Sequence, residues 1–195
     1  VYLVQDDVYG DLSFSPVRPV NLSFFSDYPG IILISSCSKS IAPGLRVGWI
    51  RSTCYSKSFT EGKLCTSMDT SLPAQSILAA YLGTRDHRKH LSAARKVLET
   101  RIDSHLRFLS EILPEGSVIR KPDGGCLLWV ALPENIDAIK VFEKAAEKGL
   151  IAAPGAIFSA SNYFNNYIRI NTGYKLTDKR AEALSVLREC NNLLK

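Results

Sequence analysis

The sequence predicts an α/β fold, and three observations support the prediction. The apolar runs Ile31–Ile34 and Val47–Ile50 show little alternation between apolar and polar residues, which is typical of strands buried on both faces of a sheet. A long stretch from Pro73 carries apolar residues at helical spacing. The last part of the chain mixes short extended runs with amphipathic helical ones. We therefore expect a mixed, mostly parallel sheet followed by a small α+β domain.

The first part of the chain, residues 1–72, is expected to contain three strands. Val1–Val4 is a run of β-forming residues, and it ends in the polar stretch Asp6–Asp11. The two apolar runs named above supply the next strands. Residues 55–73 are polar and mixed, so only a helical turn and a loop are expected there.

Residues 73–114 are predicted to form a long helical region, and residues 115–195 a small α+β domain. Apolar residues in the helical region recur every three or four positions, as one buried helix face requires: Leu91, Ala94, Leu98, Ile102, Leu106 and Leu109. The small domain is expected to contain an edge strand near Ser117–Arg120 and further strands near Cys126–Leu132 and Tyr167–Asn171. One helix is expected near Ile136–Gly149, and a final helix after Thr177.

Composition is that of an ordinary globular protein with a sizeable core. Hydrophobic residues make up 46% of the 195 residues, and 24 basic against 19 acidic residues give a net charge of +5. A solvated surface explains this mild basicity as well as nucleic-acid binding does. The five scattered cysteines lack close spacing, which predicts buried free thiols in a reducing cytoplasm. No apolar run approaches the roughly 20 residues of a membrane span, so no membrane partner is expected.

Lys39 follows the run Ile31–Ile34 and lies near two serines. A lysine at the mouth of an α/β sheet is expected to be partly desolvated, which makes its amine a better nucleophile. The hydroxyls of Ser36 and Ser38 and the guanidinium of Arg46 can hold a phosphate ester. This combination indicates pyridoxal phosphate, an aldehyde that carries a phosphate and forms a Schiff base with lysine. A surface lysine in a serine-rich loop is the alternative interpretation.

Three further residues fit the same cofactor. A buried carboxylate at Asp6 would keep the pyridine nitrogen protonated, and Tyr9 would donate a hydrogen bond to the phenolic oxygen of the ring, although Asp-x-x-Tyr is more often a plain turn. Arg169 lies inside an apolar strand, where a charge is costly unless it is paired. On the sequence alone, a substrate carboxylate and a structural salt bridge are equally good partners for this arginine.

The order and spacing of these motifs resemble the fold type I pyridoxal phosphate enzymes of the class I/II aminotransferases. The resemblance rests on DDVYG at Asp6–Gly10 and SCSKSIAPGLRVG at Ser36–Gly48. It implies that residues 1–72 correspond to the C-terminal part of a PLP-transferase large domain. It also implies the role of each residue: Schiff-base formation by Lys39, ring contacts from Asp6 and Tyr9, phosphate contacts from Ser36, Ser38 and Arg46, and substrate α-carboxylate binding by Arg169.

Later motifs narrow the resemblance to the aminotransferase-like domain of MocR-type regulators, which belong to the GntR superfamily of bacterial transcription factors. These motifs are Leu72–Gln75, His90-Leu91 with Arg95, Gly124–Trp129, Pro154–Ser159 and Asn166–Asn171. The resemblance implies a cytoplasmic homodimer that binds pyridoxal phosphate and an amino acid or related amino compound. It also implies that DNA is bound only through a winged-helix domain, which is missing from this sequence.

Two other functions stay open. A PLP-dependent aminotransferase, which moves an amino group between an amino acid and a 2-oxo acid, shares many of these motifs. A subunit-forming domain that has lost the cofactor is a third possibility, but the set Asp6, Tyr9, Lys39 and Arg46 argues against it. Because the chain opens inside a strand-like run, we expect a fragment that lacks part of the cofactor pocket.

Three other features are expected to be structural. His87 and His90 occur in a basic helical stretch without further metal ligands, so a solvated helix face is expected there and no metal site is predicted. The same stretch lacks aromatic interleaving and contains acidic residues, so it is not predicted to bind DNA. Trp129 is expected to lie in the core.

Overall fold

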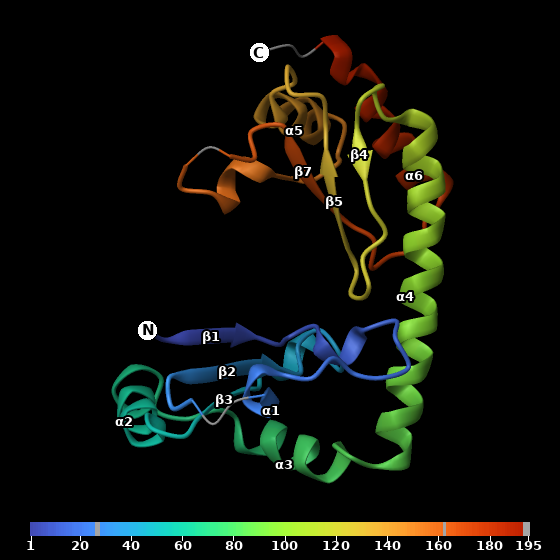
Figure 1. Cartoon of the computed structure of the whole chain (residues 1–195). Helices are drawn as coiled ribbons and strands as arrows, with labels where there is room; N and C mark the ends of the chain where they lie inside the picture. The colour runs from blue at the N-terminus through green and yellow to red at the C-terminus, as the bar shows by residue number, and fades with distance from the viewer. Residues whose placement is uncertain (26–27, 162, 193–195) are drawn as a thin grey trace. The chain divides into compact units, whose positions relative to one another are not determined.

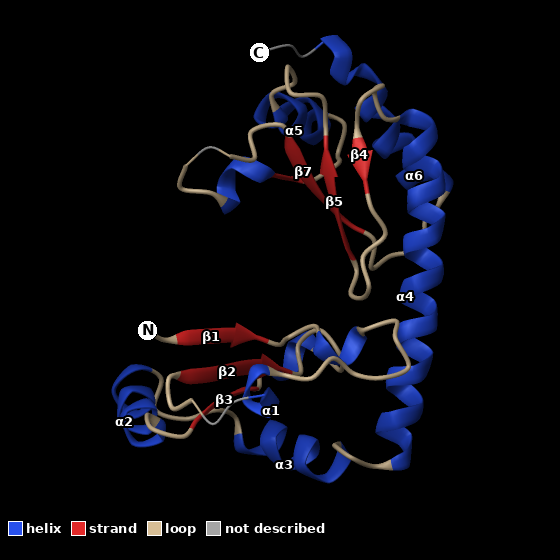
Figure 2. Ribbon diagram, viewed as in Figure 1, coloured by secondary structure: helices blue, strands red, loops and turns tan. Residues whose placement is uncertain are grey.

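The structure is a computed structural model that describes residues 1–25, 28–161 and 163–192, without the side chains of residues 25 and 190–192. The chain forms two compact units, Val1–Arg95 and Lys96–Lys195 (Figure 1). The described residues form one sheet in each unit, with three strands in the first and four in the second. The strands and helices of both units (Figure 2) confirm the predicted α/β class.

The first unit is built on a mixed sheet with the strand order β1-β2-β3. β1 (Leu3–Asp6) and β2 (Ile31–Ser36) pair in parallel, whereas β3 (Gly48–Ser52) pairs with β2 in the antiparallel direction. Each strand lies within a few residues of its predicted position. The two pairings of the described sheet are therefore one parallel and one antiparallel.

Apart from Ser52 at the end of β3, the buried residues of this sheet lie on one face of its central strand. Ile31 and Leu33 are buried, and the residues between them are half-buried. β1 and β3 are mostly exposed along their length. The expectation of strands buried on both faces is therefore wrong for the described residues, because their side chains cover only one side of β2.

Four α-helices begin in the first unit. Their bounds are α1 (Leu22–Phe25), α2 (Ser56–Thr66), α3 (Leu72–Tyr81) and α4 (Arg85–Ile112). α2 has eleven residues where only a helical turn is expected, and none of them is buried. Without an apolar stripe, this helix gives no periodic signal in the sequence.

The long helical region is interrupted between α3 and α4. Gly83 has a φ of +77°, a conformation that glycine adopts at little cost. Its N–H donates a 3.2 Å hydrogen bond to Nδ1 of His87, which is 9% exposed. The predicted solvated helix face is therefore wrong at His87, which stabilises the turn at the start of α4.

The second unit contains an antiparallel sheet with the order β4-β5-β7-β6. Its strands are β4 (Val118–Ile119), β5 (Leu127–Ala131), β6 (Ala153–Pro154) and β7 (Tyr167–Asn171). β4 lies at one edge, as predicted. Every second residue of β5 and β7 is buried, namely Leu128, Val130, Ile168 and Ile170. The second half of α4 also carries a buried stripe, formed by Ile102, His105, Leu109 and Ile112.

Two helices complete this unit. α5 (Ala138–Glu147) begins at Asp137, whose carboxylate accepts a 2.8 Å hydrogen bond from the N–H of Ile139. It is followed by Gly149, with a φ of +78°. α6 (Asp178–Leu184) begins after Thr177, which occupies the predicted cap position without a side-chain cap bond.

Short 3-10 helices span Gly10–Leu12, Pro43–Leu45 and Gly155–Phe158, and a longer one, Ser185–Asn192, follows α6. Among the described residues, no helix is both long enough and apolar enough to cross a membrane. The expectation of buried thiols is right for Cys37 and wrong for Cys54 and Cys65, which are exposed, whereas Cys126 is half-buried. The side chain of Cys190 lies outside the described residues.

Candidate functional site

The carboxyl ends of β1 and β2 form the edge from which the predicted cofactor residues project. Both strands run in the same direction, and in Figure 1 both arrows point toward the first turns of α4. The pairing continues past the strands, because the N–H of Asp7 donates to the carbonyl of Ile34 at 2.8 Å. The hydroxyl of Ser35 donates to the carbonyl of Asp7 at 3.1 Å. Asp6 and Ser36 therefore end neighbouring strands at one edge of the sheet.

The loop that carries Lys39 is closed at its base by the β2–β3 pairing. The N–H of Cys37 donates to the carbonyl of Val47 at 3.1 Å. Gly48 lies opposite Ser36, and a Cβ atom at this glycine would lie 2.8 Å from the carbonyl oxygen of Ser35. The glycine therefore permits close approach of the two strands where the loop begins and ends.

The three predicted phosphate ligands lie together within this loop. The Ser36 and Ser38 hydroxyl oxygens are 3.0 Å apart, and Nη1 of Arg46 donates to the Ser38 hydroxyl at 3.2 Å. Arg46 has a φ of +54°, in the left-handed region, at the end of the short helix Pro43–Leu45. The chain thus brings two hydroxyl groups and one guanidinium into a single hydrogen-bonded cluster, a donor set suited to a phosphate.

Lys39 is exposed, which differs from the predicted partial desolvation. No described residue forms an ion pair with its amine. The thiol of Cys37, two residues earlier, is buried, because Cys37 is only 1% exposed. Burial, together with the negative charge of Asp11, raises the pKa of Cys37. The lysine amine is therefore the accessible nucleophile of this loop, whereas the thiol stays protonated.

Two adjacent carboxylates at the end of β1 differ in exposure. Asp6 is exposed, and its Oδ1 accepts a 3.1 Å hydrogen bond from the N–H of Val8. Tyr9 is half-buried and precedes the helix Gly10–Leu12. The prediction of a buried carboxylate at Asp6 is thus wrong for the described residues, because Asp7 turns inward instead and is 9% exposed.

Arg18, which the sequence gives no reason to single out, fixes this segment. Its guanidinium forms ion pairs with Asp7 and, at 2.7 Å, with Asp11. Burial disfavours charge on Arg18, but the hydrogen bonds to Asp11 and Asp7 outweigh burial and raise the pKa of Arg18. The inward carboxylate is therefore already paired, and Asp6 stays accessible at the sheet edge.

Two side chains from the first turns of α4 reach the same edge. Nε2 of His90 lies 2.8 Å from the carbonyl oxygen of Ser40. Nε of Arg95 donates to the carbonyl of Asp11 at 2.8 Å. His90 is exposed, as a solvated helix face requires, although its ring also contacts the carbonyl of Ser40. The motif that contains His90 and Arg95 is visible in the sequence, but their backbone partners are not.

Arg169 lies in the second unit, at the centre of β7. It pairs across the sheet with Trp129 on one side and Ala153 on the other. Its guanidinium carbon lies 4.6 Å from the ring centre of Phe158, a cation–π contact. Within the described residues no carboxylate forms an ion pair with it. The salt-bridge alternative therefore has no support among these residues.

Aromatic side chains surround the exposed side of this arginine. Trp129 is 36% exposed, so the expectation of a core tryptophan is wrong. Its ring stacks on that of Tyr167 at 5.4 Å and meets Phe158 and Phe164 edge-on at 5.6 and 5.5 Å. Arg169 thus projects from the same sheet face as an aromatic cluster of four rings.

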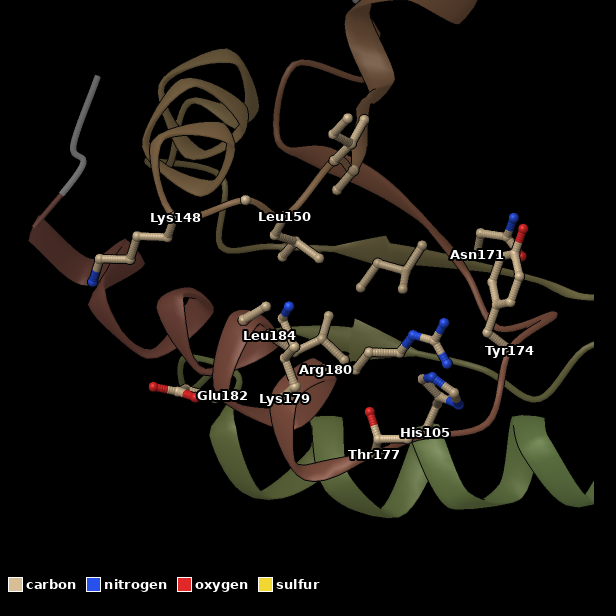
Figure 3. A pocket seen from close by; sticks show the side chains of 15 residues that line it. His105, Lys148, Leu150, Asn171, Tyr174, Thr177, Lys179, Arg180, Glu182 and Leu184 are labelled. Carbon is tan, nitrogen blue, oxygen red and sulfur yellow. The ribbon is translucent and has the colours of Figure 1, made fainter.

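A separate pocket of about 990 Å³ lies in the second unit (Figure 3). His105 and Arg180 lie close together on one side of it, whereas Glu182 points the other way. His105 is 2% exposed, and burial, with the nearby charges of Arg180 and Arg101, lowers its pKa. The pocket contains none of the residues predicted to bind the cofactor or the substrate.

Known proteins resemble this chain in sequence over nearly its whole length. The chain is 31% identical to the HTH-type transcriptional regulator YdcR of Escherichia coli, over 96% of this chain and 40% of the regulator. It is 32% identical to aromatic-amino-acid aminotransferase 1 of Thermococcus litoralis, over 96% of this chain and 45% of that protein. The chain therefore spans less than half the length of these relatives.

Solved structures resemble the chain in fold. The kynurenine aminotransferase of Pyrococcus horikoshii, solved with PMP, matches with a TM-score of 0.85 and 30% identity, over 98% of this chain and 47% of that one. LysN of Thermus thermophilus, an α-aminoadipate aminotransferase, matches with a TM-score of 0.85 and 26% identity, over 99% of this chain and 50% of that one. The family model for aminotransferase class I and II matches residues 1–185. This chain therefore belongs to the class I and II aminotransferase family.

Proposed function

We propose that this chain is the pyridoxal phosphate-binding, effector-sensing part of a MocR/GntR-type transcriptional regulator. The observation that carries the proposal is the hydrogen-bonded cluster of Ser36, Ser38 and Arg46 beside the accessible amine of Lys39. The regulatory part of the proposal is supported by two HTH-type regulators of E. coli, YdcR and YjiR, to which this chain is 31% and 32% identical. The chain spans 40% of the length of each regulator.

The residues present fit the cofactor chemically. Two hydroxyls and a guanidinium match the oxygen acceptors of a phosphate. Asp6 would hold a positive charge on the ring nitrogen, and Tyr9 would contact the phenolic oxygen. When bound, pyridoxal phosphate supplies an aldehyde that reacts with amines and a ring that withdraws electrons. The amine of Lys39 would form the covalent link to this aldehyde.

The same residues can discriminate an amino acid from other amines. Arg169 would bind the α-carboxylate with two parallel hydrogen bonds, because the guanidinium fork matches a carboxylate. Lys39, released from the cofactor, would take or return a proton at Cα. Phe158 would hold the guanidinium plane through its contact with Arg169. An amino compound that occupies these groups would favour one of two conformations of the regulator.

An aminotransferase is the second candidate function. It is favoured by the 32% identity to aromatic-amino-acid aminotransferase 1 and the 30% identity to the solved kynurenine aminotransferase. The same residues would serve both functions, so residue identity alone does not separate them. The difference lies in what happens after an amino acid binds.

The deciding experiment uses the full-length protein loaded with pyridoxal phosphate. We expect an amino compound to change the affinity for promoter DNA severalfold and Lys39→Ala to abolish this response. Turnover of an amino acid with a 2-oxo acid is measured in parallel. Sustained turnover, combined with no DNA binding, would contradict the regulatory proposal and favour the enzyme.

We further propose a domain organisation and an oligomeric state for this protein. Residues 1–72 would belong to the cofactor-binding domain, residues 73–114 would connect the domains, and residues 115–195 would form the small domain. A cytoplasmic homodimer is proposed from the family resemblance. Analytical ultracentrifugation of the full-length protein measures the assembly, and a monomer at all concentrations would contradict it.

A further inference from the structure

Two hydrogen bonds from α4 end on the two backbone segments that carry the proposed cofactor residues. His90 reaches the carbonyl of Ser40, the residue after Lys39, at 2.8 Å. Since a carbonyl oxygen only accepts, Nε2 of His90 carries the proton and donates it. The helix therefore holds the lysine loop through a contact that leaves the lysine side chain untouched.

Backbone hydrogen bonds also restrain the loop that carries Lys39. The carbonyl of Cys37 accepts hydrogen bonds from the N–H groups of Ile41 at 2.9 Å and Ala42 at 3.1 Å, which closes one turn around Lys39. Ser40 is 6% exposed, so its backbone is not freely hydrated. Without the imidazole, its carbonyl would lose a partner in a poorly solvated position, which is costly.

The second bond acts on the segment after β1. Nε of Arg95 donates to the carbonyl of Asp11 at 2.8 Å, two residues after Tyr9. The carboxylate of Asp11 is held by Arg18 at 2.7 Å, so the two arginines fix both polar groups of one residue. Between His90, which is exposed, and Arg95, which is half-buried, Leu91 is 8% exposed and packs inward.

We infer that His90 and Arg95 are positioning residues of the cofactor site. His90 sets the position of the Lys39 backbone, and Arg95 sets that of the Tyr9 segment, so that both sides of the sheet edge keep a fixed spacing for the cofactor. The effect of these two residues on cofactor binding rests on the proposed function. The contacts themselves also operate in the cofactor-free protein.

The experiment compares His90→Gln with His90→Leu in the full-length protein. The glutamine amide can donate from nearly the position of Nε2, whereas leucine has similar bulk and no donor. We expect His90→Leu to weaken pyridoxal phosphate binding about tenfold, the effect of losing one hydrogen bond to a poorly hydrated carbonyl. His90→Gln should stay within about twofold of the wild type. Binding is followed by the absorbance of the lysine-bound cofactor.

Arg95→Lys and Arg95→Leu form the second pair, in which the lysine retains a donor. Ser92→Ala, an exposed change in the same helix turns, is the control. Thermal unfolding of every variant separates lost positioning from lost folding. A weakened His90→Leu variant with unchanged unfolding temperature, rescued by glutamine, supports the inference. Equal binding by His90→Leu and wild type, or equal loss with glutamine, overturns it.

Hydrogen exchange of the cofactor-free protein separates this inference from the proposed function. We expect faster exchange at the amides of Ile41 and Ala42 in His90→Leu, and wild-type exchange in His90→Gln. If the wild type binds no pyridoxal phosphate, the proposed function fails, and the exchange result still decides the positioning role. Unchanged exchange in His90→Leu overturns that role.

Discussion

At the scale of single residues, Arg169 is a strand arginine that forms no ion pair with any residue that the structure describes. It lies in a strand between buried Ile168 and Ile170, where a charge without a partner is unfavourable. Phe158 partly compensates, because its ring lies 4.6 Å from the guanidinium carbon. This contact orients the guanidinium without neutralising it, which leaves the hydrogen-bond donors for a carboxylate.

Replacing Phe158 should therefore weaken carboxylate binding selectively. We predict that Phe158→Leu lowers the affinity for an amino acid about two- to fivefold, which corresponds to a cation–π contact of about 0.5–1 kcal/mol. Arg169→Lys should cost more, because lysine lacks the bidentate fork. Absorbance titration of the PLP-loaded full-length protein measures both. The decarboxylated amine is the matched ligand, and an equal loss for it would refute the assignment.

Gly48 is a second residue whose role is local. A methyl group there would lie 2.8 Å from the Ser35 carbonyl, which belongs to the backbone and yields little. We predict that Gly48→Ala lowers the free energy of unfolding by about 1–3 kcal/mol. Gly62→Ala is the control, since no atom lies within 4 Å of its added carbon and it lies inside α2. That change should stabilise by about 0.5–1 kcal/mol, and chemical denaturation measures both.

At the scale of elements, α4 is the helix that the sequence predicts best, but its buried face contains a histidine. Apolar periodicity predicts the helix, and the fully buried Ile102 and Leu109 confirm its inward face. His105, however, occupies a position of the same stripe at 2% exposure. Its Nδ1 lies 2.7 Å from the carbonyl of Arg101, which satisfies one ring nitrogen inside the helix. A polar residue is tolerated there because its own helix supplies a partner.

His105 should make stability depend on pH. Burial lowers its pKa in the folded state, with Arg180 and Arg101 as the charged groups facing it. The unfolded chain then binds the proton more readily, so stability is lost as pH falls below about 6.5. We predict that His105→Gln flattens this loss. Urea denaturation of both proteins between about pH 7.5 and about pH 5.5 measures the slopes, and parallel curves would contradict the prediction.

Helix α2 and the break between α3 and α4 were not predicted, each for its own physical reason. No residue of α2 is buried, so the helix carries no apolar stripe that could be read as a period. The break at Gly83 depends on a hydrogen bond to His87, a contact that spacing does not reveal. β7, in contrast, spans the predicted Tyr167–Asn171, because alternation of apolar and polar residues reports a half-buried strand directly.

At the scale of the whole molecule, the class of fold was predictable from the sequence, whereas the contacts within the candidate site were predictable only in part. The hairpin joins Ser36, Ser38 and Arg46 into one cluster, as their spacing in a short loop permits. Which of two adjacent carboxylates turns inward was not predictable, since it depends on Arg18, a residue from an irregular loop. The contacts of His90 and Arg95 were not predictable either, because their partners are backbone carbonyls, which every residue carries.

The central claim is that Lys39 forms a covalent link to pyridoxal phosphate. The most direct measurement treats the full-length protein with pyridoxal phosphate and borohydride, which makes the link permanent, and then maps the modified peptide by mass spectrometry. We predict modification at Lys39, with Arg46→Leu lowering the yield and Lys39→Ala abolishing it. Modification spread over other lysines, or unchanged in Lys39→Ala, would contradict the account.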